Sequence, residues 1–191
     1  MLAAHLGHGA SLCAIQDGRS VATTMGFTTF DGLMMGTRCG AVDPGLVLHL
    51  IRERGLTPDA VAELLNERSG LLGVSGIGDD VRDLEGSGAP HAREALDLFS
   101  YRVVREAGSL IAALGGLDTL VFTGGVGEHT ANVRAGICRG FAFDGVALDA
   151  TANGQRKSSV GAPSSPVAIR IVPAEGEREI ALSVAGLLGE S

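Results

Sequence analysis

The first 27 residues contain the pattern that most constrains the fold. Residues 2–6 have the composition of a short strand that runs into the glycine-rich bend Gly7-His8-Gly9. A second strand, residues 11–16, meets Asp17-Gly18 and is predicted to return as a third strand over residues 20–27. Asp-Gly between two strand-forming runs is a strong β-hairpin signal, because both turn residues must accept positive φ. The chain is therefore expected to build a sheet around this hairpin.

The bend before the hairpin also has the character of an anion contact. Because they lack a Cβ, Gly7 and Gly9 leave main-chain N–H groups open to a negatively charged ligand. Two tight turns in a β-sheet would explain the same residues. The bend alone therefore leaves a phosphate site and a purely structural role open.

Composition narrows the classes of function. The 191 residues are 45% hydrophobic, and we expect a single domain over residues 1–191 or a large piece of a bigger protein. No apolar run reaches membrane length and no signal-peptide pattern is present, so we expect a cytoplasmic protein without a membrane partner. A net charge of −7 argues against nucleic acid as the main partner. The three cysteines are widely spaced and suggest neither a disulfide framework nor a zinc cluster.

Residues 25–40 are predicted to form a long ordered loop. They show no sustained periodicity but contain many apolar side chains, and long loops inside compact domains are usually functional or disordered. The loop carries one cation, Arg38. An arginine there could hold a structural carboxylate or a transferring phosphoryl group, and the residues alone favour neither.

Three helices are predicted from their start signals. Asp43-Pro44 and Thr57-Pro58 each place a capping side chain before proline at the first helical position. The clearest helix begins at Pro90 and ends at Gly115-Gly116. In the first helix, one apolar face is made of Leu46, Val47, Leu50 and Ile51, and the second is expected to bury Val61, Leu64 and Leu65.

Glycine-rich segments follow two more predicted strands. Residues 71–76 lead into residues 76–83, whose acidic and basic side chains suit either a ribose or phosphate contact or a salt-bridged turn. Residues 118–123 lead into residues 124–128 and then a helix, which is the general shape of a nucleotide contact. The glycine spacing is not the dinucleotide fingerprint, so a dinucleotide-dependent oxidoreductase is disfavoured. A last helix over residues 177–188 is expected to bury Ile180, Val184 and Leu187.

Taken together and in order, these segments resemble the C-terminal half of the acetate and propionate kinase family. The resemblance covers essentially the whole chain. It implies an α/β fold of the actin-like ATPase (ribonuclease H-like) class, with a mixed β-sheet and flanking helices, as the C-terminal domain of a two-domain kinase. The segments that carry it are HLGHGAS (5–11), MGFTTFDGLMMGTRCG (25–40), SGLLGVSG (69–76), DVRDLE (80–85), FTGGVGEHTANVR (122–134) and residues 172–179.

The resemblance implies a reaction and a set of site residues. The reaction moves the γ-phosphoryl group of ATP to acetate, giving acetyl phosphate and ADP, with Mg²⁺. His5 and Arg38 are the implied catalytic residues, Glu177 is the implied Mg²⁺ contact, and a homodimer is the implied assembly. The implied nucleotide contacts are Gly7, His8, Gly9, Asp80, Val81, Arg82, Gly125, Gly127 and Glu128.

Several features depart from the family pattern. His8 and His129 stand where the family has asparagine, and Gly176 stands where it has a metal-contacting glutamate. The family is also about twice as long, and its first half supplies a second phosphate loop, a catalytic aspartate and much of the acyl pocket. A cleft with one wall missing neither excludes water nor aligns the acceptor.

We therefore expect nucleotide binding but poor turnover by this chain alone, with a separately encoded N-terminal half as the partner that restores turnover. The alternative is a degenerate half-kinase that acts as a dimerisation or interaction module. Either way, a cleft wall near Phe27, Phe30 and Met34 is expected to be exposed.

Overall fold

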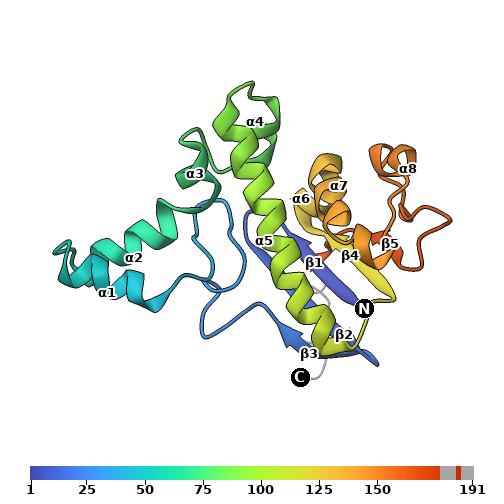
Figure 1. The fold of residues 1–191 in the computed structure, drawn as a ribbon, viewed down its shortest axis with the longest axis horizontal. Helices are drawn as coiled ribbons and strands as arrows, with labels where there is room; N and C mark the ends of the chain where they lie inside the picture. Colours follow the sequence, from blue (N-terminus) through green and yellow to red (C-terminus); the bar gives the residue numbers. More distant parts are fainter. Residues whose placement is uncertain (177–183, 186–191) are drawn as a thin grey trace.

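The computed structural model describes residues 1–176 and 184–185 and is built on a mixed β-sheet (Figure 1). Over these residues the strand order is β3-β2-β1-β4-β5. β2 is antiparallel to both β1 and β3, whereas β1, β4 and β5 run parallel to one another. The carboxyl ends of these three parallel strands therefore lie at one edge of the sheet. The strands are β1 (Leu2–Leu6), β2 (Ala10–Gln16), β3 (Arg19–Thr23), β4 (Thr119–Thr123) and β5 (Ala168–Ile171).

The predicted hairpin is confirmed. Asp17 and Gly18 connect β2 to β3 with φ values of 50° and 75°, the positive φ that an Asp-Gly turn provides. β3 ends at Thr23 rather than at residue 27. Two hydroxyl contacts close it there, because Thr23 Oγ1 donates to Leu12 O (2.8 Å) and Thr24 Oγ1 accepts from Leu12 N (2.9 Å). The chain then leaves the sheet as the long loop.

One long helix, α5, packs across β2 and also contacts β1 and β3 (Figure 1). It runs from Pro90 to Leu114, as predicted, and Gly115 ends it with φ of 72°. α7 in turn packs against α5. The other helices are α1 (Pro44–Arg52), α2 (Pro58–Glu67), α3 (Gly70–Ser75), α4 (Val81–Gly86), α6 (Gly124–His129), α7 (Ala131–Gly140) and α8 (Ala150–Gly154), with a 3-10 turn at Ala142–Asp144.

Burial alternates along the strands, as expected for a sheet with one face in a core. Alternate residues of β1, β2, β4 and β5 are buried, among them Leu2, Leu12, Phe122 and Ile169. They form one apolar cluster with the buried stripe of α5. A mixed sheet with flanking helices is the fold class expected of an actin-like ATPase domain.

The predicted strand over residues 71–76 is wrong, because these residues form α3. A short apolar run fits a buried strand or a buried helix equally well. Here the helix is favoured by its first amides, which donate to main-chain carbonyls of the long loop: Ser69 N to Thr37 O (2.9 Å), Leu71 N to Met35 O (2.9 Å) and Leu72 N to Gly36 O (3.0 Å). The loop carbonyls thus satisfy donors that a helix start otherwise leaves unpaired.

The α1–α2 arm, residues 44–67, projects to one side of the sheet (Figure 1). Both predicted caps are present, since Asp43 Oδ1 accepts from Gly45 N (2.7 Å) and Thr57 Oγ1 accepts from Ala60 N (3.2 Å). The apolar face of α1 is only partly covered: α1 has no buried residue, Leu46 is 44% exposed, and Val47, Leu50 and Ile51 are half-buried. Its neighbour in the arm, α2, buries Val61 and Leu65.

Three smaller expectations have mixed outcomes. Phe27 is fully exposed, as expected, but Met34 is buried in the core rather than exposed. Val184, expected to be buried, is exposed, whereas residues 177–183 and 186–188 of the predicted last helix, including Glu177, lie outside the described residues. No helix in the described part of the chain combines the length and apolarity needed to cross a membrane.

Candidate functional site

A pocket of about 380 Å³ lies where β1 and β4 end. In open α/β sheets, ligands bind outside the carboxyl ends of the strands, and this volume lies within the range of small-molecule sites. Three chain segments, 7–8, 79–82 and 125–130, supply its walls. The lining residues are Gly7, His8, Asp79, Asp80, Val81, Arg82, Gly125, Val126, His129 and Thr130.

Six of the nine residues proposed as nucleotide contacts line this pocket: Gly7, His8, Asp80, Val81, Arg82 and Gly125. The other three, Gly9, Gly127 and Glu128, do not, and neither do His5 and Arg38. The sequence interpretation also missed four lining residues, Asp79, Val126, His129 and Thr130. Asp79 and Val126 lie inside the glycine-rich segments 76–83 and 124–128 of the sequence analysis. His129 appeared there only as a departure from the family pattern. These three residues therefore had a signal in the sequence. Thr130 had none.

The opening bend approaches both the arginine loop and α6. A Cβ added at Gly7 would lie 3.9 Å from the amide nitrogen of Gly125, and one at Gly9 would lie 4.0 Å from Arg38 Nη1. Gly7 N donates to Gly9 O (2.9 Å) and closes the bend. The Gly7 amide is therefore not open to an anion, contrary to the expectation from the sequence. In the described part of the chain, the amides of His8 and Gly9 have no protein acceptor, which leaves them as donors at the bend.

Arg38 is a cation without a carboxylate partner among the described residues. Its Nη1 donates to Thr29 O (3.2 Å) and approaches Met35 Sδ (3.5 Å). Of the two roles that the sequence left open for Arg38, the contact with a structural carboxylate is therefore absent among the described residues.

The backbone around Arg38 is held by the start of α3. Gly70 has φ of +62°, and a Cβ there would collide with the main-chain oxygen of Met35 and lie 2.9 Å from that of Arg38. Glycine is required because both the backbone conformation and the close approach exclude a side chain. Cys39 N adds a bond to Leu65 O (2.9 Å). The position of Arg38 thus depends on α2 and α3.

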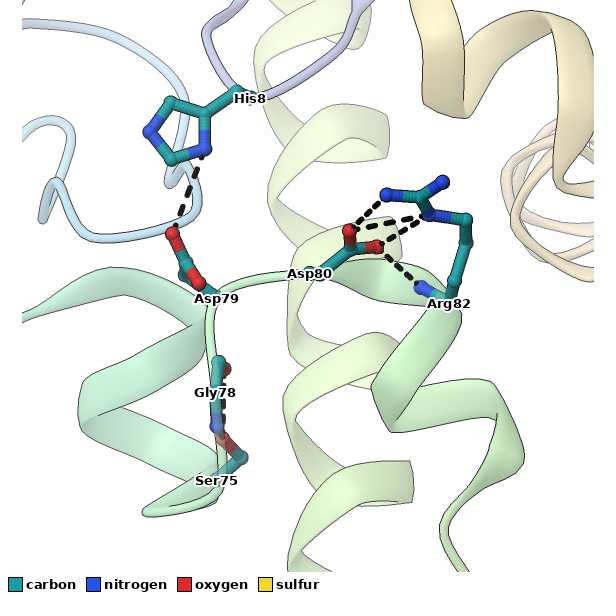
Figure 2. A network of polar contacts seen from close by, with 6 residues as sticks. All are labelled: His8, Ser75, Gly78, Asp79, Asp80 and Arg82. Atoms are coloured by element: carbon teal, nitrogen blue, oxygen red, sulfur yellow. Dashed lines mark hydrogen bonds and ion pairs between the residues drawn. The ribbon is translucent and has the colours of Figure 1, made fainter.

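The wall made by residues 79–82 follows a tight turn after α3 (Figure 2). The hydroxyl of Ser75 accepts hydrogen bonds from Ile77 N (3.1 Å) and Gly78 N (3.4 Å) and shapes that turn. The next residue, Asp79, places Oδ2 at 3.6 Å from Nδ1 of His8, which joins this wall to the opening bend.

Asp80 both caps α4 and pairs with Arg82 (Figure 2). Its Oδ1 accepts from Arg82 N (2.8 Å) and from Arg82 Nε (3.0 Å), and Arg82 Nη2 donates to Oδ2. The hydrogen bonds from the Arg82 side chain lower the pKa of Asp80 to about 2, and the same pairing raises the pKa of Arg82. The salt-bridged turn is therefore present, and both of its residues line the pocket.

The α6 wall rests on a buried arginine. Arg134 is fully buried, and its Nη1 donates to Gly127 O (2.8 Å) and Glu128 O (2.9 Å) at the end of α6. Its Nε and Nη2 donate to the side chain and main chain of Asn153 (2.7 and 2.9 Å). Burial lowers the pKa of Arg134. The predicted glycine loop 124–128 is itself the short helix α6, which this arginine anchors to α8.

His129 lies at the exposed end of α6, with Nδ1 at 3.2 Å from Arg156 Nη1. Because the guanidinium can only donate, Nδ1 is the acceptor in this contact. The described residues contain no group of three His, Cys, Asp or Glu side chains that could hold a metal ion.

A family model described as the acetokinase family matches residues 1–182. The chain belongs to the acetokinase family. Among curated relatives, it is 53% identical to an acetate kinase of Rhodopseudomonas palustris over 96% of this chain and 47% of that protein. It is 43% identical to an acetate kinase of Methylocella silvestris, over 100% of this chain and 47% of that one. The chain thus spans about half the length of the curated relatives it matches.

Solved structures of the acetokinase family have the same fold. The acetate kinase of Porphyromonas gingivalis matches with a TM-score of 0.91 at 39% identity, over 98% of this chain and 48% of that one. A propionate kinase from Francisella tularensis matches with a TM-score of 0.86 at 36% identity, over 91% of this chain and 46% of that one. The fold class expected from the sequence is therefore confirmed.

Proposed function

We propose that this chain forms the nucleotide-binding side of a phosphotransferase that moves a phosphoryl group between ATP and acetate. The observation that carries the proposal is the approach of three segments to one edge of the sheet in a member of the acetokinase family. These segments are the opening bend, the loop of Arg38 and the start of α6. Phosphoryl transfer depends mainly on positioning and on neutralising charge, and this edge offers both main-chain donors and a cation.

The phosphate end of the nucleotide is proposed to lie at the bend. There the amides of His8 and Gly9 and the guanidinium of Arg38 would meet the transferring group, with His5 beside them at the end of β1. Positive charge at that point stabilises the negative charge that develops during transfer. The adenosine end is proposed to lie between Asp80–Arg82 and Gly125–Val126, on facing walls of the pocket.

Mg²⁺ is the implied metal, and the segment after β5 is the part of the chain proposed to hold it. Mg²⁺ in such sites takes one or two carboxylates together with phosphate oxygens and water, so it does not need a cluster of protein ligands. Glu175 is exposed on this segment, and Glu177 follows it. These acids would hold the metal, which when bound neutralises phosphate charge.

Calorimetry with ADP and with ATP tests the proposal. We expect a Kd below about 1 mM, within the usual range for enzyme substrates. Arg38→Ala should weaken ATP binding about tenfold or more, because it removes a charge-assisted hydrogen bond to the transferring phosphoryl group, which ADP lacks. Arg54→Ala, on the exposed surface of the α1–α2 arm, is the matched control and should bind as the unmodified chain does. Equal binding by both variants, or no binding by the unmodified chain, would contradict the proposal.

Turnover is proposed to need the residues that the family's first half supplies. In a coupled acetyl phosphate assay, the chain alone should be nearly inactive, and adding the first half of a full-length relative should restore activity. A homodimer and a cytoplasmic location complete the proposal.

A second candidate function is a dimerisation or interaction module without chemistry. The observation that favours it is apolar exposure: Leu46 and Leu48 on α1 are 44% and 49% exposed, and Phe27 is fully exposed. Sedimentation over a range of concentrations, together with calorimetry using MgADP, separates the two. Self-association without nucleotide affinity would leave only this second function.

A further inference from the structure

We infer that the side-chain hydroxyl of Thr130 binds the adenine base of the nucleotide. This inference rests on the proposed function, which places adenosine between the α4 and α6 walls of the pocket. It adds to that site a residue that carried no signal in the sequence.

The backbone of Thr130 is held firmly at the junction of two helices. The residue follows the last residue of α6 and precedes the first residue of α7. Its main-chain N–H donates to Val126 O (3.0 Å), and its carbonyl oxygen accepts from Arg134 N (3.3 Å). Arg134 is fully buried and also binds the carbonyl oxygens at the end of α6. Thr130 therefore has a fixed place on the pocket wall.

The hydroxyl of Thr130 has no hydrogen-bond partner in the described part of the chain. A threonine at this position usually caps the helix that follows by accepting from one of its first amides. In α7 that capping bond is absent. The residue is nevertheless only 3% exposed. A polar group taken out of water without a partner is destabilising, so an unpaired hydroxyl at such a buried position calls for an explanation.

The pocket supplies that explanation. Among the described residues, no side-chain oxygen or nitrogen that is fully enclosed by protein lacks a hydrogen-bond partner. The unpaired oxygen of Thr130 is therefore not fully enclosed, and the open space that this residue lines is the pocket at the ends of β1 and β4. A ligand in the pocket can reach the hydroxyl without displacing any bond within the protein.

The position of Thr130 favours the base over the phosphates. Gly125, near the start of α6, approaches the opening bend, where the phosphates are proposed to lie. Thr130 is five residues further along, which is about 7.5 Å at the helical rise of about 1.5 Å per residue. It therefore lies toward the end of the pocket that is remote from the bend.

The neighbouring side chains suit a flat ring. Val81 and Val126 line the pocket from facing walls, and both are apolar. The faces of a purine are apolar, whereas its edge carries hydrogen-bonding groups. A threonine hydroxyl both donates and accepts, so it can pair with the amine or with a ring nitrogen of adenine.

A ligand contact and a structural role predict different results for Thr130→Val, which keeps the branched shape but removes the hydroxyl. If the hydroxyl stabilised the junction of α6 and α7, the variant should unfold at a lower temperature. If the hydroxyl serves the ligand, the variant should unfold at the same temperature or higher, because an unpaired polar group is replaced by a methyl group. It should nevertheless bind ADP more weakly.

The test measures ADP binding by calorimetry and thermal unfolding without ligand. Thr130→Val should weaken ADP binding about threefold to tenfold, the usual effect of losing one neutral hydrogen bond. Thr130→Ser keeps the hydroxyl and should bind ADP as the unmodified chain does. Thr119→Val is the matched control, because Thr119 is half-buried at the other end of β4, and it should leave ADP binding unchanged.

Three further ligands locate the contact. The loss in Thr130→Val should persist with 2′-deoxy-ADP, with 3′-deoxy-ADP and with AMP, because each of them keeps the base. A loss that disappears with either deoxy ligand would assign the hydroxyl to the ribose, and one that disappears with AMP would assign it to the terminal phosphate. Each of these results would overturn the inference.

The failure of this inference can be told from that of the proposed function. If the unmodified chain binds ADP and Thr130→Val binds it equally well, or if Thr130→Val unfolds at a clearly lower temperature, only the role of Thr130 is refuted. If the unmodified chain binds no ADP, the proposed function fails and the inference fails with it.

Discussion

Two amphipathic helices of this protein have different surroundings: α5 lies in the core against the sheet, and α1 lies in the α1–α2 arm. α5 buries six side chains against the sheet and its neighbouring helices, whereas α1 buries none. Both helices have an apolar stripe in the sequence, and both begin with proline at the first helical position. An apolar stripe thus indicates a face that could be buried, but whether it is buried depends on what the rest of the chain places against it. Four pairs of matched substitutions test this contrast.

The largest difference is expected between Phe99→Ala on α5 and Leu48→Ala on α1. Phe99 is 1% exposed and Leu48 is 49% exposed. Emptying the Phe99 site should lower the free energy of unfolding by about 3–5 kcal/mol through lost burial and a cavity. The Leu48 substitution should change it by no more than about 0.5 kcal/mol, as is usual on an open surface. Urea unfolding of both variants measures the contrast, and equal costs would show that α1 is covered.

The second pair is Arg134→Met at the base of the pocket and Arg54→Ala on the arm. Losing the buried guanidinium leaves the carbonyls of Gly127 and Glu128 without their donor. Each unsatisfied buried acceptor costs about 1–3 kcal/mol, so a total loss of about 3 kcal/mol is expected. Arg54 is exposed, and its removal should be nearly neutral. Thermal unfolding monitored by circular dichroism measures both, and a neutral Arg134→Met would contradict the anchoring of α6.

The third pair compares two glycines of positive φ. Gly70 and Gly55 have φ of 62° and 68°, but only Gly70 has main-chain oxygens where a Cβ would lie. Gly55→Ala should cost about 1 kcal/mol from backbone conformation alone. Gly70→Ala should cost at least about 1 kcal/mol more and should also weaken ATP binding, because the loop of Arg38 must shift. Denaturant unfolding and calorimetry with ATP on both variants test this, and unaltered ATP binding by Gly70→Ala would show that the loop of Arg38 does not contribute to the site.

The smallest effect is expected at the two capping aspartates. The pKa of Asp80 lies near 2 in the folded chain, below its ordinary value of 3.8. Its pairing therefore stabilises the fold above about pH 3.8, and the benefit is lost as the pH falls through about 2. Asp80→Asn should cost slightly more than Asp43→Asn at pH 7, because asparagine caps as well as aspartate but cannot pair with Arg82. Stability curves from pH 7 to 2 should show the Asp80→Asn deficit disappearing at the acidic end.

Much of the fold could be predicted because the signals are local. The Asp17-Gly18 turn, the caps at Asp43 and Thr57 and the full length of α5 each depend on residues within a few positions of one another. The strand predicted at residues 71–76 failed for the opposite reason. That apolar run becomes a helix because carbonyls from residues 35–37 receive its first amides.

In the candidate site, too, some features could be predicted from local sequence and others depend on contacts between distant residues. The glycine-rich segments at residues 7–9 and 124–128 are visible in the sequence, since glycines after strands are typical of ligand contacts. The sequence interpretation gave no indication that Asp79 would stand opposite His8, nor that Thr130 would line the pocket. Such contacts join residues brought together only by the parallel pairing of β1 with β4 and by the turn after α3.

By itself, then, the sequence determined the hairpin, the helix starts, the family and the glycines that leave room at the sheet edge. Only the tertiary structure decided that α1 has no fully buried residue, that Arg38 has no carboxylate partner among the described residues, and that Glu128 reaches Ala174 rather than the pocket. The physical reason is the range of the interactions. Turns and caps are set by neighbouring residues, whereas burial and carboxylate contacts depend on which distant segments the folded chain brings together.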